Sequence, residues 1–210
     1  MYCPSLFRES RLPSLHALMR AHPLAMMITA GDEGLMANLL PFTLCETGGY
    51  GTLRAHIAKG NTQLKALAAG SEVLVVFQGP ESYIPPSWYP SKARHGKVVP
   101  TWNYAVVQAR GTPRLIDDAV WLRAQVEALT ASQEGARPEP WQVSDAPDTY
   151  VATLMHGIVG LEIPISRLEG KSKLSQNRNE EDRQGVQDGL RREGVNDEMV
   201  RMLARLPKPD

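Results

Sequence analysis

Short apolar stretches separated by turn residues run through the first eighty residues of the chain. Residues 24–29 and 35–44 flank the segment Gly-Asp-Glu-Gly at 31–34, which is the pattern of a β-hairpin. Pro41 lacks a backbone N–H, so it predicts an edge position or a bulge in the second strand. Further strands are predicted at residues 50–56 and 72–78, the latter ending at Gly79-Pro80.

The rest of the chain adds three predicted strands and several helices. The strands are residues 99–109 and 112–116, joined as a hairpin around Gly111, and residues 158–165. Helices are predicted at residues 13–21, 61–69, 117–133 with Asp117 as N-cap, 148–155, and in two segments after Asn179, the second capped by Asn196. Residues 80–98 are predicted to be a long loop. Hairpins interrupted and followed by helices predict an α+β protein built on an antiparallel barrel with flanking and C-terminal helices, rather than a doubly wound parallel sheet.

The charge balance and the cysteines restrict the setting in which this chain works. It has 23 Lys and Arg against 23 Asp and Glu, so no overall electrostatic field attracts a nucleic acid. Cys3 and Cys45 form no Cys-x-x-Cys pair, which argues against a disulfide framework or a zinc ribbon. The N-terminus lacks the layout of a secretory signal, and apolar runs such as 73–77 are far shorter than the roughly 20 residues of a membrane span. We therefore expect a cytoplasmic protein without membrane contact.

Common catalytic motifs are missing from the sequence. It contains no Walker A loop, no dinucleotide Gly-x-Gly-x-x-Gly, no Gly-x-Ser-x-Gly elbow and no His-Glu-x-x-His. The histidines show no ligand spacing, so no metal site is expected; they are His16, His22, His56, His95 and His156. Neither paired carboxylates nor a nucleophile with a neighbouring base is evident. The residues therefore favour a ligand site over a reaction.

Residues 52–61, Thr-Leu-Arg-Ala-His-Ile-Ala-Lys-Gly-Asn, form the most informative stretch. Alternation along a strand places Arg54 and His56 on one face. Lys59 follows in a turn, and the N–H groups near Asn61 at a helix start favour an anion such as a phosphate. A phosphorylated small ligand is one hypothesis. The alternative is a solvated sheet face with Asn61 serving only as a helix cap.

Two later stretches combine cations with groups that can hold a ligand. Residues 83–104 interleave aromatic side chains with basic ones, which can stack on a flavin or on bases while the cations hold phosphate. Residues 170–178 carry three cations and several hydrogen-bonding side chains after the last strand. The alternatives are an ordered loop packed on the barrel or on a partner subunit, and a solvated basic turn.

Five ordered motifs extend over nearly the whole chain. They are Met-Tyr-x-Pro-x-x-Phe at 1–7, Ala-Asn-Leu-Leu-Pro-Phe at 37–42, Pro-Ser-Trp-Tyr at 86–89, Val-Pro-Thr-Trp-Asn-Tyr at 99–104 and Lys-Leu-Ser-Gln-Asn-Arg at 173–178. With these motifs the chain resembles the PaiB-like family of FMN-binding negative transcriptional regulators. That family is similar in fold to the pyridoxamine-phosphate-oxidase-like split β-barrels, which bind FMN at the interface of a homodimer.

The resemblance implies FMN as the cofactor and a homodimer as the assembly. It implies that the strand around Asn38 to Phe42, which includes Leu39, lies along the isoalloxazine ring. The residues implied near the ribityl phosphate are Arg54, His56, Lys59 and Asn61, with Gln78 near the ring or the ribityl chain. The residues implied to come from the partner subunit are Trp102, Asn103, Lys173 and Gln176. No catalytic residue and no metal ligand is implied.

The resemblance also implies a domain plan and a function. Residues 1–170 are expected to form the split-barrel FMN-binding domain, with a helical insertion at about 117–156, and residues 171–210 a basic turn and a helical tail packed on the barrel. The implied function is negative regulation of sporulation or degradative-enzyme genes, through DNA or a protein partner. Residues 179–206 are the candidate for DNA contact, although they show no helix-turn-helix pattern. The alternatives are a flavin-dependent oxidoreductase of the pyridoxamine-phosphate-oxidase-like class and a cofactor-free interaction protein on the same fold.

Overall fold

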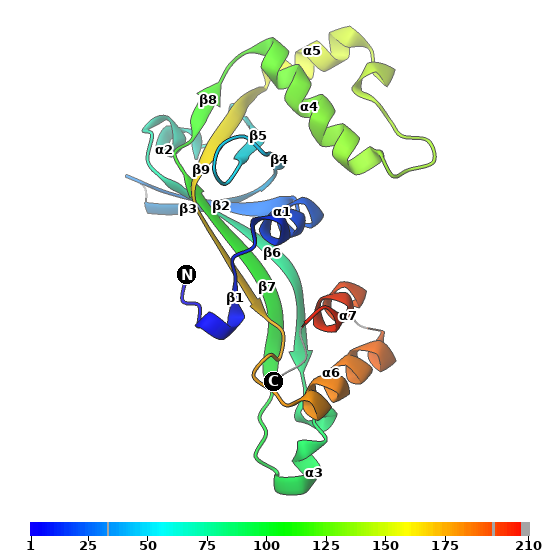
Figure 1. Cartoon of the computed structure of the whole chain (residues 1–210). Coiled ribbons are helices and arrows are strands. Elements are labelled where there is room, and N and C mark those ends of the chain that lie inside the picture. Colours follow the sequence, from blue (N-terminus) through cyan, green and yellow to red (C-terminus); the bar gives the residue numbers. More distant parts are fainter. Residues whose placement is uncertain (33, 195, 207–210) are drawn as a thin grey trace. The chain divides into compact units, whose positions relative to one another are not determined.

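The computed structural model describes residues 1–32, 34–194 and 196–206 of the chain (Figure 1). The chain divides into two compact units. Unit 1 comprises Met1–Leu15, Gln78–Val107 and Glu169–Asp210. Unit 2 comprises His16–Phe77 and Gln108–Leu168. No helix in the described ranges is both long enough and apolar enough to cross a membrane.

The described residues form nine strands in one sheet. The strands are β1 (Arg8–Glu9), β2 (Leu24–Gly31), β3 (Gly34–Pro41), β4 (Thr43–Cys45), β5 (Thr52–Ala58), β6 (Val73–Ile84), β7 (Thr101–Gly111), β8 (Arg114–Ile116) and β9 (Ile158–Lys173). Their order is β3-β2-β6-β7-β9-β5-β4, and β1 and β8 each pair with β9. The register pairs of β2 with β3, β2 with β6 and β5 with β9 are antiparallel. The predicted α+β class with an antiparallel sheet is confirmed.

Helices and short 3-10 turns connect and follow these strands (Figure 1). They are η1 (Ser5–Phe7), α1 (Leu12–Ala21), α2 (Leu64–Ala68), η2 (Pro86–Trp88), α3 (Ser91–His95), α4 (Ala119–Glu134), η3 (Val143–Asp145), α5 (Asp148–His156), α6 (Glu180–Glu193) and α7 (Asp197–Ala204). The predicted cap at Asn196 is confirmed, because its side chain accepts from the backbone N–H of Met199 at 3.1 Å.

Strand β3 of the β2–β3 hairpin has the edge position that Pro41 predicts. Its register runs from Leu24 opposite Pro41 to Gly31 opposite Gly34, and β3 lies at one end of the strand order. Proline has no backbone N–H to donate, and in an edge strand this costs no hydrogen bond inside the sheet. Glu33, in the predicted turn, lies outside the described residues.

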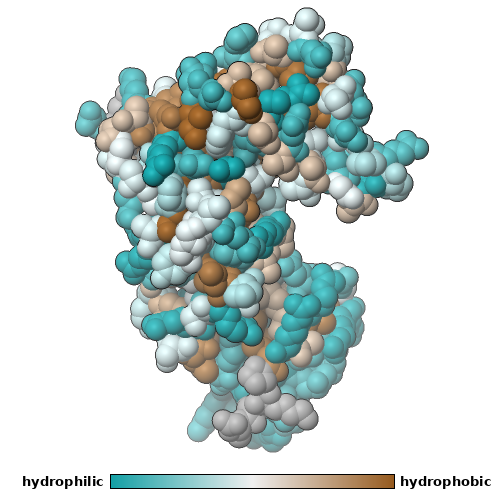
Figure 2. Space-filling model, turned by 45° about the horizontal axis from the view of Figure 1, so that its top comes forward, coloured by the Kyte–Doolittle hydropathy of each residue, from teal (hydrophilic) through white to brown (hydrophobic). Residues whose placement is uncertain are grey.

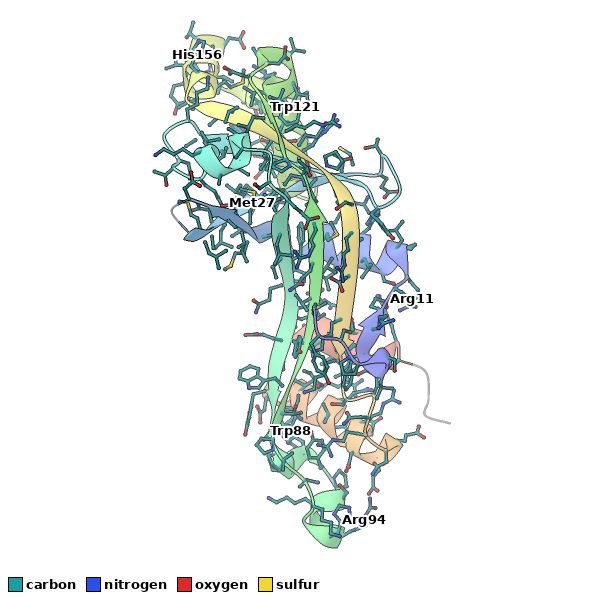
Figure 3. All side chains as sticks on the ribbon, turned by 90° about the vertical axis from the view of Figure 1, so that its left-hand side faces the viewer. Arg11, Met27, Trp88, Arg94, Trp121 and His156 are labelled. Carbon is teal, nitrogen blue, oxygen red and sulfur yellow. The ribbon has the colours of Figure 1, made fainter. Side chains whose placement is uncertain are left out.

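Unit 2 has its core on the inner faces of its strands. Alternate residues of β5 are buried, namely Leu53, Ala55 and Ile57. Met27 of β2, labelled in Figure 3, is fully buried, and the rings of Phe42 and Phe77 pack with centroids 6.0 Å apart. Because side chains alternate along a strand, the core residues of β5 lie on one face and its polar side chains, Arg54 and His56, lie on the other.

Unit 1 has a separate core built around Trp88. The buried residues of this cluster are Ile84, Trp88, Tyr89, Leu174, Val186, Leu190, Met199 and Leu203. Helix α6 lies directly on the indole ring (Figure 3), because a Cβ at Gly189 would be 2.2 Å from Trp88 Cδ2. Only a glycine allows so close an approach at this position.

Two predicted strand ends and one predicted strand pairing are wrong. β6 does not end at Gly79-Pro80 but continues to Ile84, because alternate burial extends through Ser82 and Ile84. β9 continues to Lys173, so the predicted basic turn at 170–178 begins as strand. The segment after Gly111 is not paired as a hairpin, since β8 pairs with β9 in the register Leu115 opposite Leu161.

Two other local predictions are also wrong. Residues 80–98 are not a loop, because they contain the end of β6, η2 and α3. The N-cap of α4 is Asp118 rather than Asp117, since an Asp118 carboxylate oxygen accepts from the Trp121 backbone N–H at 2.7 Å.

Candidate functional site

The end of β5 and the turn that follows it form the centre of the candidate site, here called the β5 corner (residues 54–63). Residues 53, 55 and 57 face the core of unit 2, so Arg54 and His56 lie on the opposite face, as alternation predicts. The backbone N–H of Lys59 donates to Gly157 O at 2.8 Å, and that of Asn61 donates to Ala58 O at 2.9 Å. These bonds fix the path of the chain as it leaves the sheet.

A buried amide, Gln63, connects the β5 corner to strand β3. Gln63 is 0% exposed, and its Oε1 accepts from Asn38 Nδ2 at 2.9 Å. Its backbone N–H donates to Asn61 Oδ1 at 2.9 Å. Its Nε2 lies within hydrogen-bond distance of Thr29 Oγ1 at 3.1 Å and of the carbonyl oxygens of Met27 and Met36 at 3.2 and 3.3 Å. The structure thus brings Asn38 and Asn61, both predicted from the resemblance, onto one network whose central residue the sequence did not reveal.

Arg54 is held within the protein by an ion pair and an aromatic ring. Its Nε donates to Glu162 Oε2 at 2.9 Å, and its guanidinium carbon lies 5.7 Å from the ring centroid of Trp121. Glu162 is opposite Arg54 on β5 and opposite Arg114 on β8. Arg54 therefore has a structural role whether or not it also contacts a ligand.

His56 lies on the sheet face that Trp121 of α4 covers. Its register partner on β9 is Gly160, where a Cβ would be 2.3 Å from the Trp121 ring. His56 Nδ1 is buried and has no hydrogen-bond partner. Burial lowers the pKa of this imidazole, so the neutral form is favoured near neutral pH.

Lys59 carries the exposed cation of the β5 corner. Its Nζ donates to an Asp117 carboxylate oxygen at 3.0 Å, with the two side chains 43% and 71% exposed. An ion pair this open to water contributes little stability. A phosphate group can therefore replace Asp117 as the partner of Lys59 at small cost.

The helix predicted after the β5 corner is shorter than expected. The sequence predicts a helix over 61–69, but α2 begins at Leu64 and has only five residues. Residues 61–63 form hydrogen-bonded turns instead, with Leu64 N–H donating to Asn61 O. A helix this short contributes little dipole, so anion binding here depends on side chains.

Leu39 lies exposed on β3 of unit 2, whereas the other predicted residues lie in unit 1, where most of them gather around one turn. Asn103 is fully buried and donates from Nδ2 to Ser175 Oγ at 3.0 Å. Lys173 Nζ donates to Trp102 O at 2.7 Å and to the Thr101 hydroxyl, while Gln176 accepts from Leu174 N–H and donates to Ser172 O. Burial, followed by the positive charges of Lys171 and Arg178, lowers the pKa of Lys173. These side chains thus shape the 172–176 turn from within the chain.

Trp102 and Gln78 have more exposed positions. Trp102 packs edge-on against Tyr83 with ring centroids 5.7 Å apart, and about half of its surface stays open to water. Gln78 Nε2 donates to Glu81 Oε2 at 3.0 Å on the outside of β6. In the part of the chain that the structure describes, no group of three or more His, Cys, Asp or Glu side chains is placed to hold a metal ion.

The sheet and the polar corner beside it define a split-barrel protein of the flavin-binding kind. Its fold is similar to that of the FAD and heme binding protein from Mycobacterium smegmatis, with a TM-score of 0.59, 18% identity, and coverage of 79% of this chain and 73% of that one. The chain belongs to the family described as "Putative FMN-binding domain", whose model matches residues 1–167. The expected family and its cofactor, FMN, are thereby confirmed.

Two relatives extend over almost the full length of the chain. Uncharacterized protein AN0679 of Emericella nidulans is 38% identical over 231 residues, covering 93% of this chain and 92% of its own. The protease synthase and sporulation protein PAI 2 of Bacillus subtilis is 28% identical over 193 residues, covering 92% of this chain and 90% of its own. The PaiB-like resemblance seen in the sequence is thus confirmed.

The β5 corner fits the phosphate end of FMN. Lys59 is an exposed cation with a replaceable partner, Asn61 is held in place by Gln63, and His56 presents a buried ring nitrogen without a partner. These are the donor types that recognise a phosphate and its neighbouring hydroxyls. FMN, when bound, supplies one- and two-electron redox chemistry that no side chain carries.

Proposed function

We propose that this protein is an FMN-binding regulator that represses genes, and that the β5 corner holds the phosphate of its flavin. The observation that carries the flavin site is the Asn38–Gln63–Asn61 network, which joins strand β3 to the turn that follows the exposed Lys59. The name of the Bacillus subtilis relative, a protease synthase and sporulation protein, supports a regulatory role in sporulation or degradative-enzyme production.

Each residue of the β5 corner has a distinct role in this proposal. Lys59 pairs with the phosphate in place of Asp117, and Asn61 donates to it from its side chain. Neutral His56 offers its free ring nitrogen to a ribityl hydroxyl. Asn38 and Leu39 contact the flavin ring from β3. Arg54 acts indirectly by holding Glu162 and the Trp121 ring.

We also propose that the protein is a homodimer and that residues of unit 1 reach the flavin from the partner subunit. Trp102, with its half-exposed ring, is the side chain suited to stack on the flavin, and Lys173 orders the strand that carries it. Figure 2 shows hydrophobic residues at the surface among hydrophilic ones. The large apolar side chains exposed on the β2–β3 hairpin are Leu24, Met26, Leu35 and Leu39, and a second subunit would cover such side chains.

Titration with two flavins tests the phosphate site. FMN and riboflavin share the ring and ribityl chain but differ in the phosphate. Lys59→Ala should weaken FMN binding about tenfold and leave riboflavin binding unchanged, since one charge-assisted contact is lost. Arg192→Ala, which removes the same charge from an exposed position of α6, is the control. Binding is followed by the visible absorption of the flavin, and equal loss for both flavins would refute a phosphate role.

A redox assay and a transcript assay separate regulator from enzyme. Bound FMN mixed with NADH or NADPH without oxygen should stay oxidised if the protein is a regulator, whereas rapid reduction would support the oxidoreductase alternative.

Deleting the gene should raise a defined set of transcripts, and Lys59→Ala in the chromosome should raise the same set. If no flavin binds at all, the cofactor-free interaction protein becomes the better description.

A further inference from the structure

A pocket of about 440 Å³ lies between one face of α4, the end of α1 and strands β4 and β5, entirely within unit 2. We call it the α4 pocket. Helix α4 contributes Trp121, Ala124, Gln125, Ala128 and Ser132 to its wall. Because these positions follow the helical repeat, they share one face, and the small side chains among them leave the space open. The volume is in the range of small-molecule sites in proteins.

Gln125 is a buried residue of this pocket whose hydrogen bonding is incomplete. It is 3% exposed, its Oε1 accepts from the Thr43 hydroxyl at 3.0 Å, and its Nε2 is buried without a partner. Turning the amide over would let Nε2 donate to Thr43 but would leave Oε1 without a donor. In both orientations one polar atom of a buried amide is unsatisfied, and a ligand in the pocket can supply the missing partner.

The other lining residues indicate the chemistry of that ligand. Phe42, Phe77 and Trp121 provide aromatic surface. Arg20 and Arg54 provide positive charge, and there is no carboxylate among the described residues of the lining. Arg54 bonds Glu162 through Nε and Arg20 bonds Glu46 through one terminal nitrogen, so each guanidinium has other N–H donors to offer.

We propose that the α4 pocket binds a small aromatic carboxylic acid. The ring lies among Phe42, Phe77 and Trp121, where edge and offset contacts are favourable. The carboxylate accepts from Gln125 Nε2 and from free N–H groups of the arginines, in charge-assisted hydrogen bonds. The α4 pocket shares Arg54 with the β5 corner, but neither Lys59 nor Asn61, the residues proposed to contact the phosphate, lines it.

The test uses three probe acids of increasing size, benzoate, indole-3-carboxylate and naphthalene-2-carboxylate. Calorimetric titration should give saturable binding of at least one acid at one site per chain. The matching neutral carboxamide should bind about tenfold more weakly, because it lacks the charge. Gln125→Leu should weaken binding of the acid, and Gln125→Glu should weaken it further by repulsion.

Two matched variants of α4 locate the site. Ala128→Phe places a ring in the pocket and should abolish acid binding, whereas Ala131→Phe, at an exposed position of the same helix that does not line the pocket, should leave it unchanged. Melting temperatures of both variants near that of the parent protein show that the fold is intact. The proposal is overturned if no acid binds saturably, if Ala128→Phe binds as well as Ala131→Phe, or if acid and carboxamide bind equally. It is also overturned if Ala128→Phe removes FMN binding as well, because the pocket would then belong to the flavin site.

Discussion

Replacing Gln63 by leucine should destabilise the protein strongly even without a ligand. The leucine has a similar volume but lacks the amide. The amide oxygen of Gln63 accepts one hydrogen bond from Asn38, and its Nε2 has two protons to donate to the three oxygens of Met27, Thr29 and Met36 that lie within reach. Three hydrogen bonds are lost, each with a net value of about 1 kcal/mol, and Thr29 is left buried with one partner fewer. The expected loss in the free energy of unfolding is therefore about 3 kcal/mol.

Urea denaturation of flavin-free protein, followed by tryptophan fluorescence and circular dichroism together, measures this loss. The two signals must change together for a single free energy to be meaningful. Gln184→Leu is the matched control, since Gln184 is exposed on α6 and bonds only Asp188; it should change stability by less than about 0.5 kcal/mol. A Gln63→Leu loss below about 1 kcal/mol would refute the reasoning that this amide anchors β3 to the β5 corner.

Two further perturbations test other parts of unit 2. His56 has a folded-state pKa below its unfolded value, so the unfolded chain binds more protons as the pH falls through about 6.5, and stability should drop on that acid side and level off below the folded pKa. His56→Gln should remove this part of the pH dependence, while His156→Gln, at an exposed helix end, should retain it; identical profiles for both variants would contradict the assignment. Gly160→Ala places a Cβ 2.3 Å from the Trp121 ring and should lower the free energy of unfolding, measured by thermal denaturation, by about 1–3 kcal/mol. The loss should be smaller in a protein in which Trp121 is replaced by leucine. If the losses in free energy of unfolding from the two substitutions are strictly additive, the Trp121 ring is not in steric contact with position 160 of β9.

Local patterns predicted the parts of the fold that depend on neighbouring residues. Alternation in β5 separated Arg54 and His56 from the core because a strand repeats every two residues. Pro41 indicated an edge strand because it has no N–H to donate. Asn196 indicated a helix start because its side chain reaches a backbone N–H three residues on.

Pairings between distant residues could not be predicted in the same way. β8 follows Gly111 closely enough to suggest a hairpin, yet it pairs with β9, and only the assembled sheet determines that choice. Gln63 has no pattern that marks it as buried, since its four partners come from β2 and β3. The ion pair of Arg54 with Glu162 joins residues 108 positions apart. The residue pattern and the likeness to a family indicated the candidate residues, but only the structure shows which of them are already bonded to each other.

The Trp88 core of unit 1 has a consequence for how the chain folds during synthesis. Ile84 and Trp88 are made before the middle of the chain, while their partners Val186, Leu190 and Met199 are made near its end. Because domains fold as units, this core cannot close while the ribosome is still producing α6 and α7. A nascent chain halted before residue 180 would keep an indole and its apolar neighbours uncovered, and would be a natural target for chaperones or proteases.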